Sequence, residues 1–179
     1  MADQVALTEL FELAAASSGG IGAYRPGPLP FVTSAAANNG VVAYVTPLAG
    51  DRVFAGPAIC VSALGQASVH LGAFLPKGNG GDSLTVLLPR QDAALGPLDL
   101  IGLAAAFNLL HRWRFSYGRK CSLARLAPLA LPADLPPVAP LWLAETARAE
   151  AVTRRVGGLA GPDGTGSPRW TSSATRRRP

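Results

Sequence analysis

The sequence is short of side chains that hold metal ions. Its 179 residues include two cysteines, Cys60 and Cys121, and two histidines, His70 and His111. No two of these four lie close together in the sequence, whereas a zinc site usually draws on ligands paired at short spacing. The cysteines are therefore interpreted as buried or incidental and the histidines as structural, and no metal site is predicted.

Catalytic patterns are scarce as well. The acidic residues occur singly, without the clustered carboxylates that hold a divalent metal in a nuclease. The glycine-rich stretch 77–82 lacks the Gly-Lys-Ser/Thr ending of a phosphate loop and precedes a strand-like segment, so it is interpreted as a connecting turn. The Pro136-Pro137 pair follows Leu135, where a methyltransferase motif has Asn or Asp. The sequence predicts a protein that is not an enzyme, without catalytic residues or a cofactor.

Long apolar runs are missing too, although 49% of the residues are hydrophobic. The longest run, around 101–110, is too short to span a bilayer, and His111 and Arg112 follow it at once. The N-terminus has no basic segment followed by an apolar one, so no signal peptide is expected. These absences predict a cytoplasmic protein with no membrane partner.

The net charge of +5 is unevenly distributed. Residues 1–147 hold nine basic and nine acidic residues, whereas residues 148–179 hold seven arginines and two acids. The C-terminal segment therefore carries the whole excess, and we expect it to add salt-dependent, non-specific affinity for nucleic acid. Within the neutral part, residues 100–133 contain no acid but five basic residues with three aromatics among them. These are Arg112, Trp113, Arg114, Phe115, Tyr117, Arg119, Lys120 and Arg125.

Short strand-like segments and one long helix make up the expected elements. Residues 97–113 predict the helix, because Pro97 and Asp99 suit a helix start. The Asn-Gly pair at 39–40 predicts a hairpin or tight turn. Strands are expected at 31–34, 41–45, 58–63, 67–74, 83–88 and 129–132, a strand or irregular segment at 7–13, a loop at 19–30, a turn at 78–81, and a short helix capped by Ser122.

This pattern predicts an α+β fold, in which a twisted, mostly antiparallel or mixed sheet packs on one main helix. Residues 1–136 are expected to form the folded domain. Residues 137–156 are interpreted as a proline-containing linker and a short Ala-rich helix, and 157–179 as a disordered basic tail.

The stretch 112–121, Arg-Trp-Arg-Phe-Ser-Tyr-Gly-Arg-Lys-Cys, is the most informative about function. Its Arg and Lys side chains suit phosphates or guanine edges, and its Ser and Tyr hydroxyls suit phosphates or bases. On composition alone, a solvated helix end with two core aromatics is an equally good interpretation.

Residues 115–120 resemble a motif near the end of DNA specificity domains. These are the target-recognition domains of type I restriction-modification specificity subunits and of related fused restriction-methylation enzymes. The segment 123–126, Leu-Ala-Arg-Leu, and the strand-like segment 129–132 follow in the family's order. Residues 10–13 and 29–45 are similar to the family's opening segment and strand–turn–strand signature, so the resemblance covers about 7–132.

The resemblance implies sequence-specific binding of double-stranded DNA, with a partner methyltransferase, and often an endonuclease, positioned on the site. The candidate DNA-binding residues are Thr33, Ser34, Asn38 and Asn39 in one segment and Arg114, Ser116, Tyr117, Arg119 and Lys120 in another. Arg119 is expected to read a base and Lys120 to bind a phosphate, while Phe115 and Trp113 pack inward. For residues 38–40, a plain hairpin is at least as good an interpretation.

A full type I specificity subunit resembles two such domains joined by long helices, whereas this sequence has one. The chain is therefore interpreted as a half-size subunit, a detached module or a degenerate gene. Two rival functions stay open at this point. An enzyme would reveal itself by cofactor binding to the purified chain. A protein-interaction module whose basic tail binds nucleic acid without sequence preference would be revealed by deleting 157–179.

Overall fold

The structure is a computed structural model that describes residues 3–133, 148 and 151–152. The chain divides into two units, Met1–Ala139 and Pro140–Pro179. In the second unit Arg148, Ala151 and Val152 are helical, inside the helix expected at 141–156. The predicted boundaries at 136 and 156, the linker and the basic tail lie outside the described residues.

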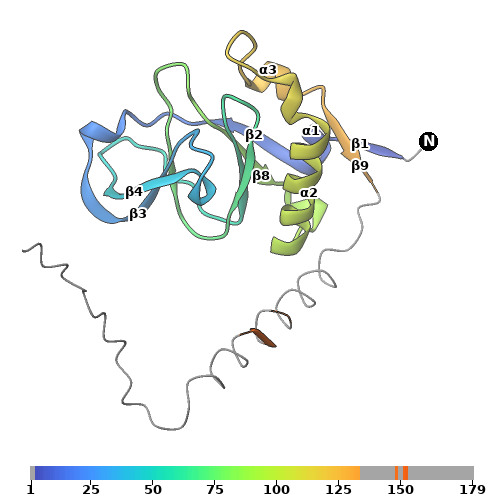
Figure 1. Cartoon of the computed structure of the whole chain (residues 1–179), viewed down its shortest axis with the longest axis horizontal. Helices are drawn as coiled ribbons and strands as arrows, with labels where there is room; N and C mark the ends of the chain where they lie inside the picture. The colour runs from blue at the N-terminus through green and yellow to red at the C-terminus, as the bar shows by residue number, and fades with distance from the viewer. Residues whose placement is uncertain (1–2, 134–147, 149–150, 153–179) are drawn as a thin grey trace, which may run out of the picture. The chain divides into compact units, whose positions relative to one another are not determined.

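The described strands form three small sheets (Figure 1). The largest is antiparallel and has the order β2-β8-β5-β6. A three-stranded sheet has the order β4-β3-β7, with β4 antiparallel and β7 parallel to β3. The first and last strands, β1 and β9, form an antiparallel pair. The strands are β1 Gln4–Ala6, β2 Phe11–Ala15, β3 Arg25–Val32, β4 Val41–Thr46, β5 Ala58–Val61, β6 Ala67–His70, β7 Leu75–Pro76, β8 Thr85–Pro89 and β9 Ala130–Pro132.

One main helix, α2 (Pro97–Leu110), covers the four-stranded sheet at its β5–β6 side. It begins where Pro97 takes the first helical position and Asp99 Oδ2 accepts the Gly96 N–H at 2.8 Å. It ends three residues before the expected end, because residues 112–114 form a 3₁₀ turn. The shorter helices are α1 Leu7–Leu10 and α3 Leu123–Leu126, with 3₁₀ turns η1 Ile21–Ala23, η2 Asn38–Gly40, η3 Gln91–Ala93 and η4 Arg112–Arg114.

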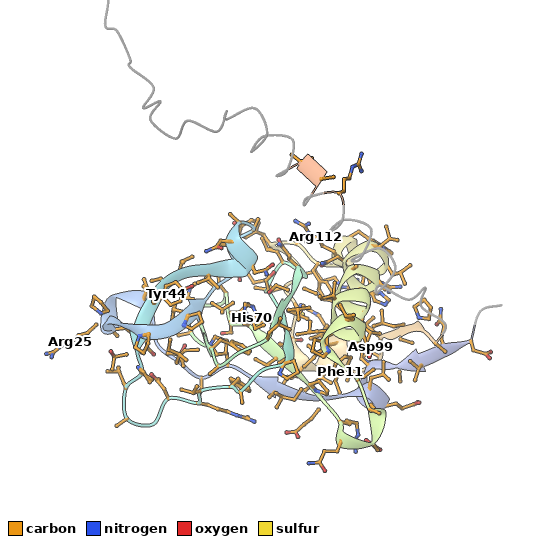
Figure 2. All side chains as sticks on the ribbon, turned by 90° about the horizontal axis from the view of Figure 1, so that it is seen from below. Phe11, Arg25, Tyr44, His70, Asp99 and Arg112 are labelled. Atoms are coloured by element: carbon orange, nitrogen blue, oxygen red, sulfur yellow. The ribbon has the colours of Figure 1, made fainter. Side chains whose placement is uncertain are left out.

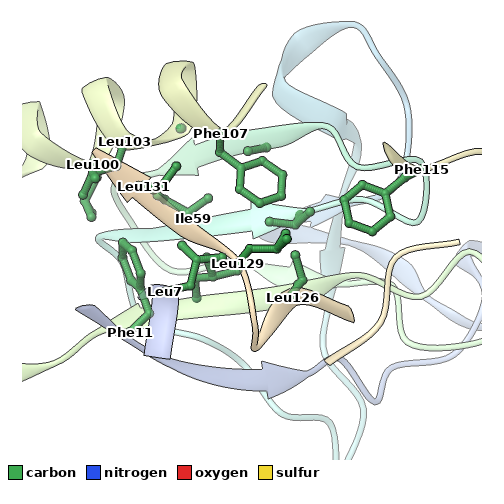
Figure 3. Packing of buried hydrophobic residues seen from close by; sticks show 14 residues of the cluster. Leu7, Phe11, Ile59, Leu100, Leu103, Phe107, Phe115, Leu126, Leu129 and Leu131 are labelled. Carbon is green, nitrogen blue, oxygen red and sulfur yellow. The ribbon is translucent and has the colours of Figure 1, made fainter. Parts of the chain in front are cut away.

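The largest core cluster lies between α2, the four-stranded sheet and the C-terminal elements α3 and β9 (Figure 3). Leu103 and Phe107 come from α2, Ile59 from β5, and Leu126 and Leu131 from the C-terminal part. A second cluster includes Phe54 and Phe74, and a smaller third one is made by residues of β3, β4 and β7. Burial of this kind contributes about 25 cal/mol per Å² of apolar surface, so it fixes α2 on the sheet.

The α+β prediction is confirmed, with the strands of 25–89 shared between two sheets. The loop expected at 19–30 is wrong from Arg25 onward, because β3 begins there despite its prolines. Prolines are tolerated in this strand since β7 pairs only with Phe31 and Val32, leaving its earlier residues at an edge. The uncertain segment 7–13 divides into the single turn α1 and the start of β2.

Asn108 joins α2 to the edge strand β6. Its Oδ1 accepts the Ala67 N–H at 2.7 Å, and its Nδ2 donates to the Ala67 carbonyl at 2.9 Å. The side-chain amide thus takes the place of a neighbouring strand at the buried Ala67.

Replacing Asn108 with alanine is expected to lower the free energy of unfolding by about 2 kcal/mol, because both Ala67 backbone groups lose their partner. Leu109→Ala is the control, since Leu109 is exposed on the same helix and its loss should cost about 0.5 kcal/mol or less. Urea unfolding of the two variants measures the difference. Equal stabilities would contradict a structural role for the Asn108 amide.

Candidate nucleic-acid interface

The segment after α2 is built to display its polar residues. Phe115 is buried, and its ring lies against Gly65 in the β5–β6 turn. Ser116 and Arg119 then exchange two backbone hydrogen bonds, of 3.1 and 3.0 Å, which close a tight turn. Tyr117, at the tip of this turn, is 81% exposed. The Cys121 N–H donates to the Ala63 carbonyl at 2.8 Å and holds the far end of the segment to the domain.

Phe115 anchors the segment as predicted, but the inward packing expected of Trp113 is wrong. Trp113 is 74% exposed, because the 3₁₀ turn carries it away from the core side of α2. Its Nε1 donates to the Leu110 carbonyl at 2.8 Å, and the Arg114 guanidinium lies 5.0 Å from its ring centroid. Arg112 lies at the same end of α2 (Figure 2).

The second candidate segment is the connection between β3 and β4. Asn38 and Asn39 both have φ of 51°, and Gly40 has φ of 80°. Asn38 Nδ2 donates to the Val41 carbonyl at 3.1 Å, so this amide serves the turn itself. The structure therefore supports the hairpin interpretation for Asn38, whereas the exposed Asn39 side chain has no such hydrogen bond within the described part of the chain.

The two candidate segments meet at the glycine-rich turn 77–82. A hollow of about 580 Å³ has Thr33, Ser34, Lys77, Asp82 and Tyr117 in its lining, over apolar residues that include Phe31 and Leu64. Residues 33–34 and 117 come from segments some 80 positions apart in the sequence. Asn38, Asn39, Arg114, Ser116, Arg119 and Lys120 do not line this hollow.

A second hollow, of about 500 Å³, adjoins the first at Tyr117. Asn108, Arg112, Trp113 and Ser116 line it, and Tyr117 and Leu64 line both hollows. The exposed Tyr117 therefore borders two depressions of the surface. A surface of this shape, which carries an aromatic ring, hydroxyls and cations, can contact phosphates and base edges at the same time.

The electrostatics of the site are mainly positive. Arg112, Arg114 and Arg119 are exposed, and within the described residues the side chains of Arg112 and Arg119 make no hydrogen bond or ion pair. Asp82 is the acid of the first hollow, and its carboxylate faces Lys120 and Lys77. The hydrogen bond from Lys120 lowers the pKa of Asp82, so this carboxylate is ionised at neutral pH.

No metal-binding cluster exists among the described residues, where no three His, Cys, Asp or Glu side chains come together. Burial raises the pKa of Cys121 to about 12 and raises that of Cys60 as well, so both thiols stay protonated and unreactive at neutral pH. None of the described helices is long and apolar enough to cross a membrane.

Comparison with solved structures assigns the fold. No family model and no curated protein matches the sequence. The chain superposes on a structure from a study of assembly and conformational transition in the type I R-M system, with a TM-score of 0.55 and 20% identity over 88% of this chain. It also matches the HsdS subunit from Thermoanaerobacter tengcongensis, with a TM-score of 0.54 and 19% identity over 88% of this chain.

The chain has a type I S-subunit fold. The type I restriction-modification S subunit from M. genitalium also matches, with a TM-score of 0.53 and 14% identity over 73% of this chain. This chain covers 33–39% of the matched proteins, so it corresponds to a part of each. The fold implied by the resemblance of residues 115–120 is confirmed.

The S-subunit fold brings Thr33, Ser34 and Tyr117 to one hollow, with Lys120 bonded to its rim residue Asp82. Lys77, Asp82, Arg112 and Trp113 belong to the same surface, although they were not among the predicted site residues. The acid-free basic stretch could have indicated Arg112 and Trp113. Lys77 and Asp82 gave no signal beyond a plain connecting turn, since their role depends on which segments the fold brings to them.

Proposed function

We propose that this chain is a DNA target-recognition domain that binds double-stranded DNA sequence-specifically and directs partner methyltransferase and endonuclease subunits to that site. The observation that carries the proposal is the convergence of the two candidate segments on one surface. We name this surface, made by residues 33–40, 77–82 and 112–120, the recognition surface.

Shape and charge both support binding to duplex DNA. The tight turn 116–119 carries the exposed Tyr117, and Arg114 before the turn and Arg119 at its end are exposed as well. Exposed arginines can reach guanine edges in the major groove, while the lysines and hydroxyls around the hollow suit phosphates. The domain itself contributes recognition, and the proposed partners contribute the methyl transfer and the cleavage.

Arg119 and Lys120 are proposed to play different parts. The Arg119 side chain is exposed and makes no hydrogen bond or ion pair within the described residues, so it is available to a base edge. The Lys120 side chain is partly buried and its Nζ is hydrogen-bonded to Asp82 at 3.0 Å, which offers a positive charge at a defined position for a phosphate. The first contact carries sequence information and the second carries none.

Arg119→Ala is expected to cost about 1–3 kcal/mol of discrimination at one base position, while Lys120→Ala weakens binding to all sequences alike. Selection from a randomised duplex pool at constant salt, followed by affinity measurements on the selected sequences, tests both. Arg90→Ala is the matched control, because it removes one cation outside the recognition surface. Wild-type affinity and preference in both folded variants would place the DNA-reading surface elsewhere.

A further inference from the structure

Asp82 connects the three segments of the recognition surface. Its backbone carbonyl accepts a hydrogen bond from Ser34 Oγ at 3.3 Å. One carboxylate oxygen accepts from Lys120 Nζ at 3.0 Å, and the other lies 3.9 Å from Lys77 Nζ. The Asp82 side chain is 46% exposed, so DNA on this surface would meet its charge. Among the described residues of this surface, no other residue is hydrogen-bonded to both candidate segments.

A carboxylate in this position opposes general binding to DNA. It repels phosphates directly, and it partly offsets the charge of two lysines that would otherwise attract phosphates more strongly. Each phosphate contact by a cation adds about 0.9 to the slope of log affinity against log salt for duplex DNA. A surface that served only non-specific binding would gain from losing this acid.

The same carboxylate restrains the Lys120 side chain. A lysine has a flexible stem with several rotatable bonds, and it can follow a phosphate over a range of positions. The bond to Asp82, together with the cation–π contact of Lys120 with the Tyr117 ring at 5.8 Å, limits that range. A restrained cation favours DNA that lies in one register on the surface. Sequence-dependent contacts elsewhere on the surface then contribute a larger share of the binding free energy.

We propose that Asp82 is a positioning residue that restrains Lys77 and Lys120 against general binding of DNA phosphates, and so raises the share of binding that depends on sequence. The effect of Asp82 on sequence dependence rests on the proposed function. The restraint of the two lysines affects the affinity for any duplex, so it can be measured independently of sequence preference.

Asp82→Asn is the test, and Asp92→Asn is its matched control. Both variants remove one negative charge from a partly or fully exposed ion pair, but Asp92 pairs with Arg90 outside the recognition surface. The full-length chains are titrated with two duplex pools of equal length across a salt series. One pool is selected by the wild-type chain and the other has scrambled sequences. Asp82→Glu, which keeps the carboxylate, measures rescue, and thermal unfolding reports whether each variant is folded.

In Asp82→Asn, affinity for the scrambled pool is expected to rise several-fold, with a salt slope steeper by about 1–2 than in Asp92→Asn. The ratio of affinities for the two pools should fall, and Asp82→Glu should restore part of it. Equal slopes in the two Asn variants would overturn the inference, as would weaker binding to both pools by folded Asp82→Asn. Should Asp82→Asn fail to fold, Asp82→Ser and the matched Asp92→Ser replace the pair, with the same two outcomes.

The outcomes separate this inference from the proposed function. A wild-type chain that binds both pools alike contradicts sequence-specific recognition, whatever the variants do. A wild-type chain that prefers its selected pool, with identical slopes for the two Asn variants, leaves the proposed function intact and overturns the role of Asp82. A wild-type chain that binds no duplex overturns both.

Discussion

Gly65→Ala is expected to lower the free energy of unfolding by about 3 kcal/mol and to displace the 112–120 segment. Gly65 has φ of +77°, a conformation that costs a residue with a Cβ roughly 1 kcal/mol or more. A Cβ at this position would also lie 2.4 Å from Phe115 Cδ2, well inside van der Waals contact. Overpacking of this kind in a core typically adds about 1–3 kcal/mol, because the ring must leave its position.

Gly50→Ala separates the two contributions. Gly50 has φ of +90°, and a Cβ there would meet no atom within 4 Å, so only the backbone strain of about 1 kcal/mol is expected. Urea unfolding gives both stabilities, and duplex binding by the folded fraction shows whether moving Phe115 disturbs the recognition surface. Equal destabilisation of the two variants would contradict the anchoring of the segment by Phe115 against Gly65.

Acidification from pH 6.5 to about pH 4 is expected to remove about 3 kcal/mol of stability through His70 alone. His70 is buried inside the domain (Figure 2), its ring stacks on Phe74 at 4.7 Å, and its Nε2 lies 3.1 Å from Ser68 Oγ. Burial lowers the pKa of His70 to about 4 in the folded chain. Between these two pH values the unfolded chain binds the additional proton and is favoured, so stability falls as pH falls.

Well above pH 6.5, the ordinary pKa that His70 keeps in the unfolded chain, the ring is neutral in both states and contributes no pH dependence. The measurement is urea unfolding at several pH values for the wild-type chain and for His70→Gln, which is polar but does not titrate. The difference between the two curves of unfolding free energy against pH gives the contribution of His70, because the carboxylates contribute equally to both. Asp82, whose pKa is lowered, acts in a separate window, because its contribution is lost only as pH falls below the ordinary carboxyl range. Parallel curves for the two chains would contradict the buried neutral His70.

Elements encoded by neighbouring residues were predictable from the sequence. The Asn-Gly turn at 38–40, the β5–β6 hairpin and the start of α2 at Pro97 all depend on local backbone preferences. The strand at 25–30 was missed because prolines usually mark loops, and what permits them here is an unpaired edge. Whether a strand lies at an edge depends on the arrangement of the whole sheet, so a local sequence pattern cannot predict it.

The candidate site was predictable in its parts and not in its assembly. The basic, aromatic stretch 112–120 and the polar residues 33–34 were identified by their side-chain types. Their meeting at Asp82 depends on contacts between residues 38 and 48 positions apart, which the sequence pattern does not encode. The exposure of Trp113 was missed because it depends on α2 ending at Leu110, and helix ends are poorly determined by periodicity.

The pairing of β1 with β9 places the two ends of the segment 4–132 side by side. Gln4 lies opposite Pro132 and Ala6 opposite Ala130, so the chain enters and leaves about 5 Å apart, the spacing of paired strands. A longer protein interrupted at a single surface position could accommodate residues 4–132 without separating the halves of the host. Such an insertion would leave the two junctions with the host close together, because both lie at the β1–β9 pair.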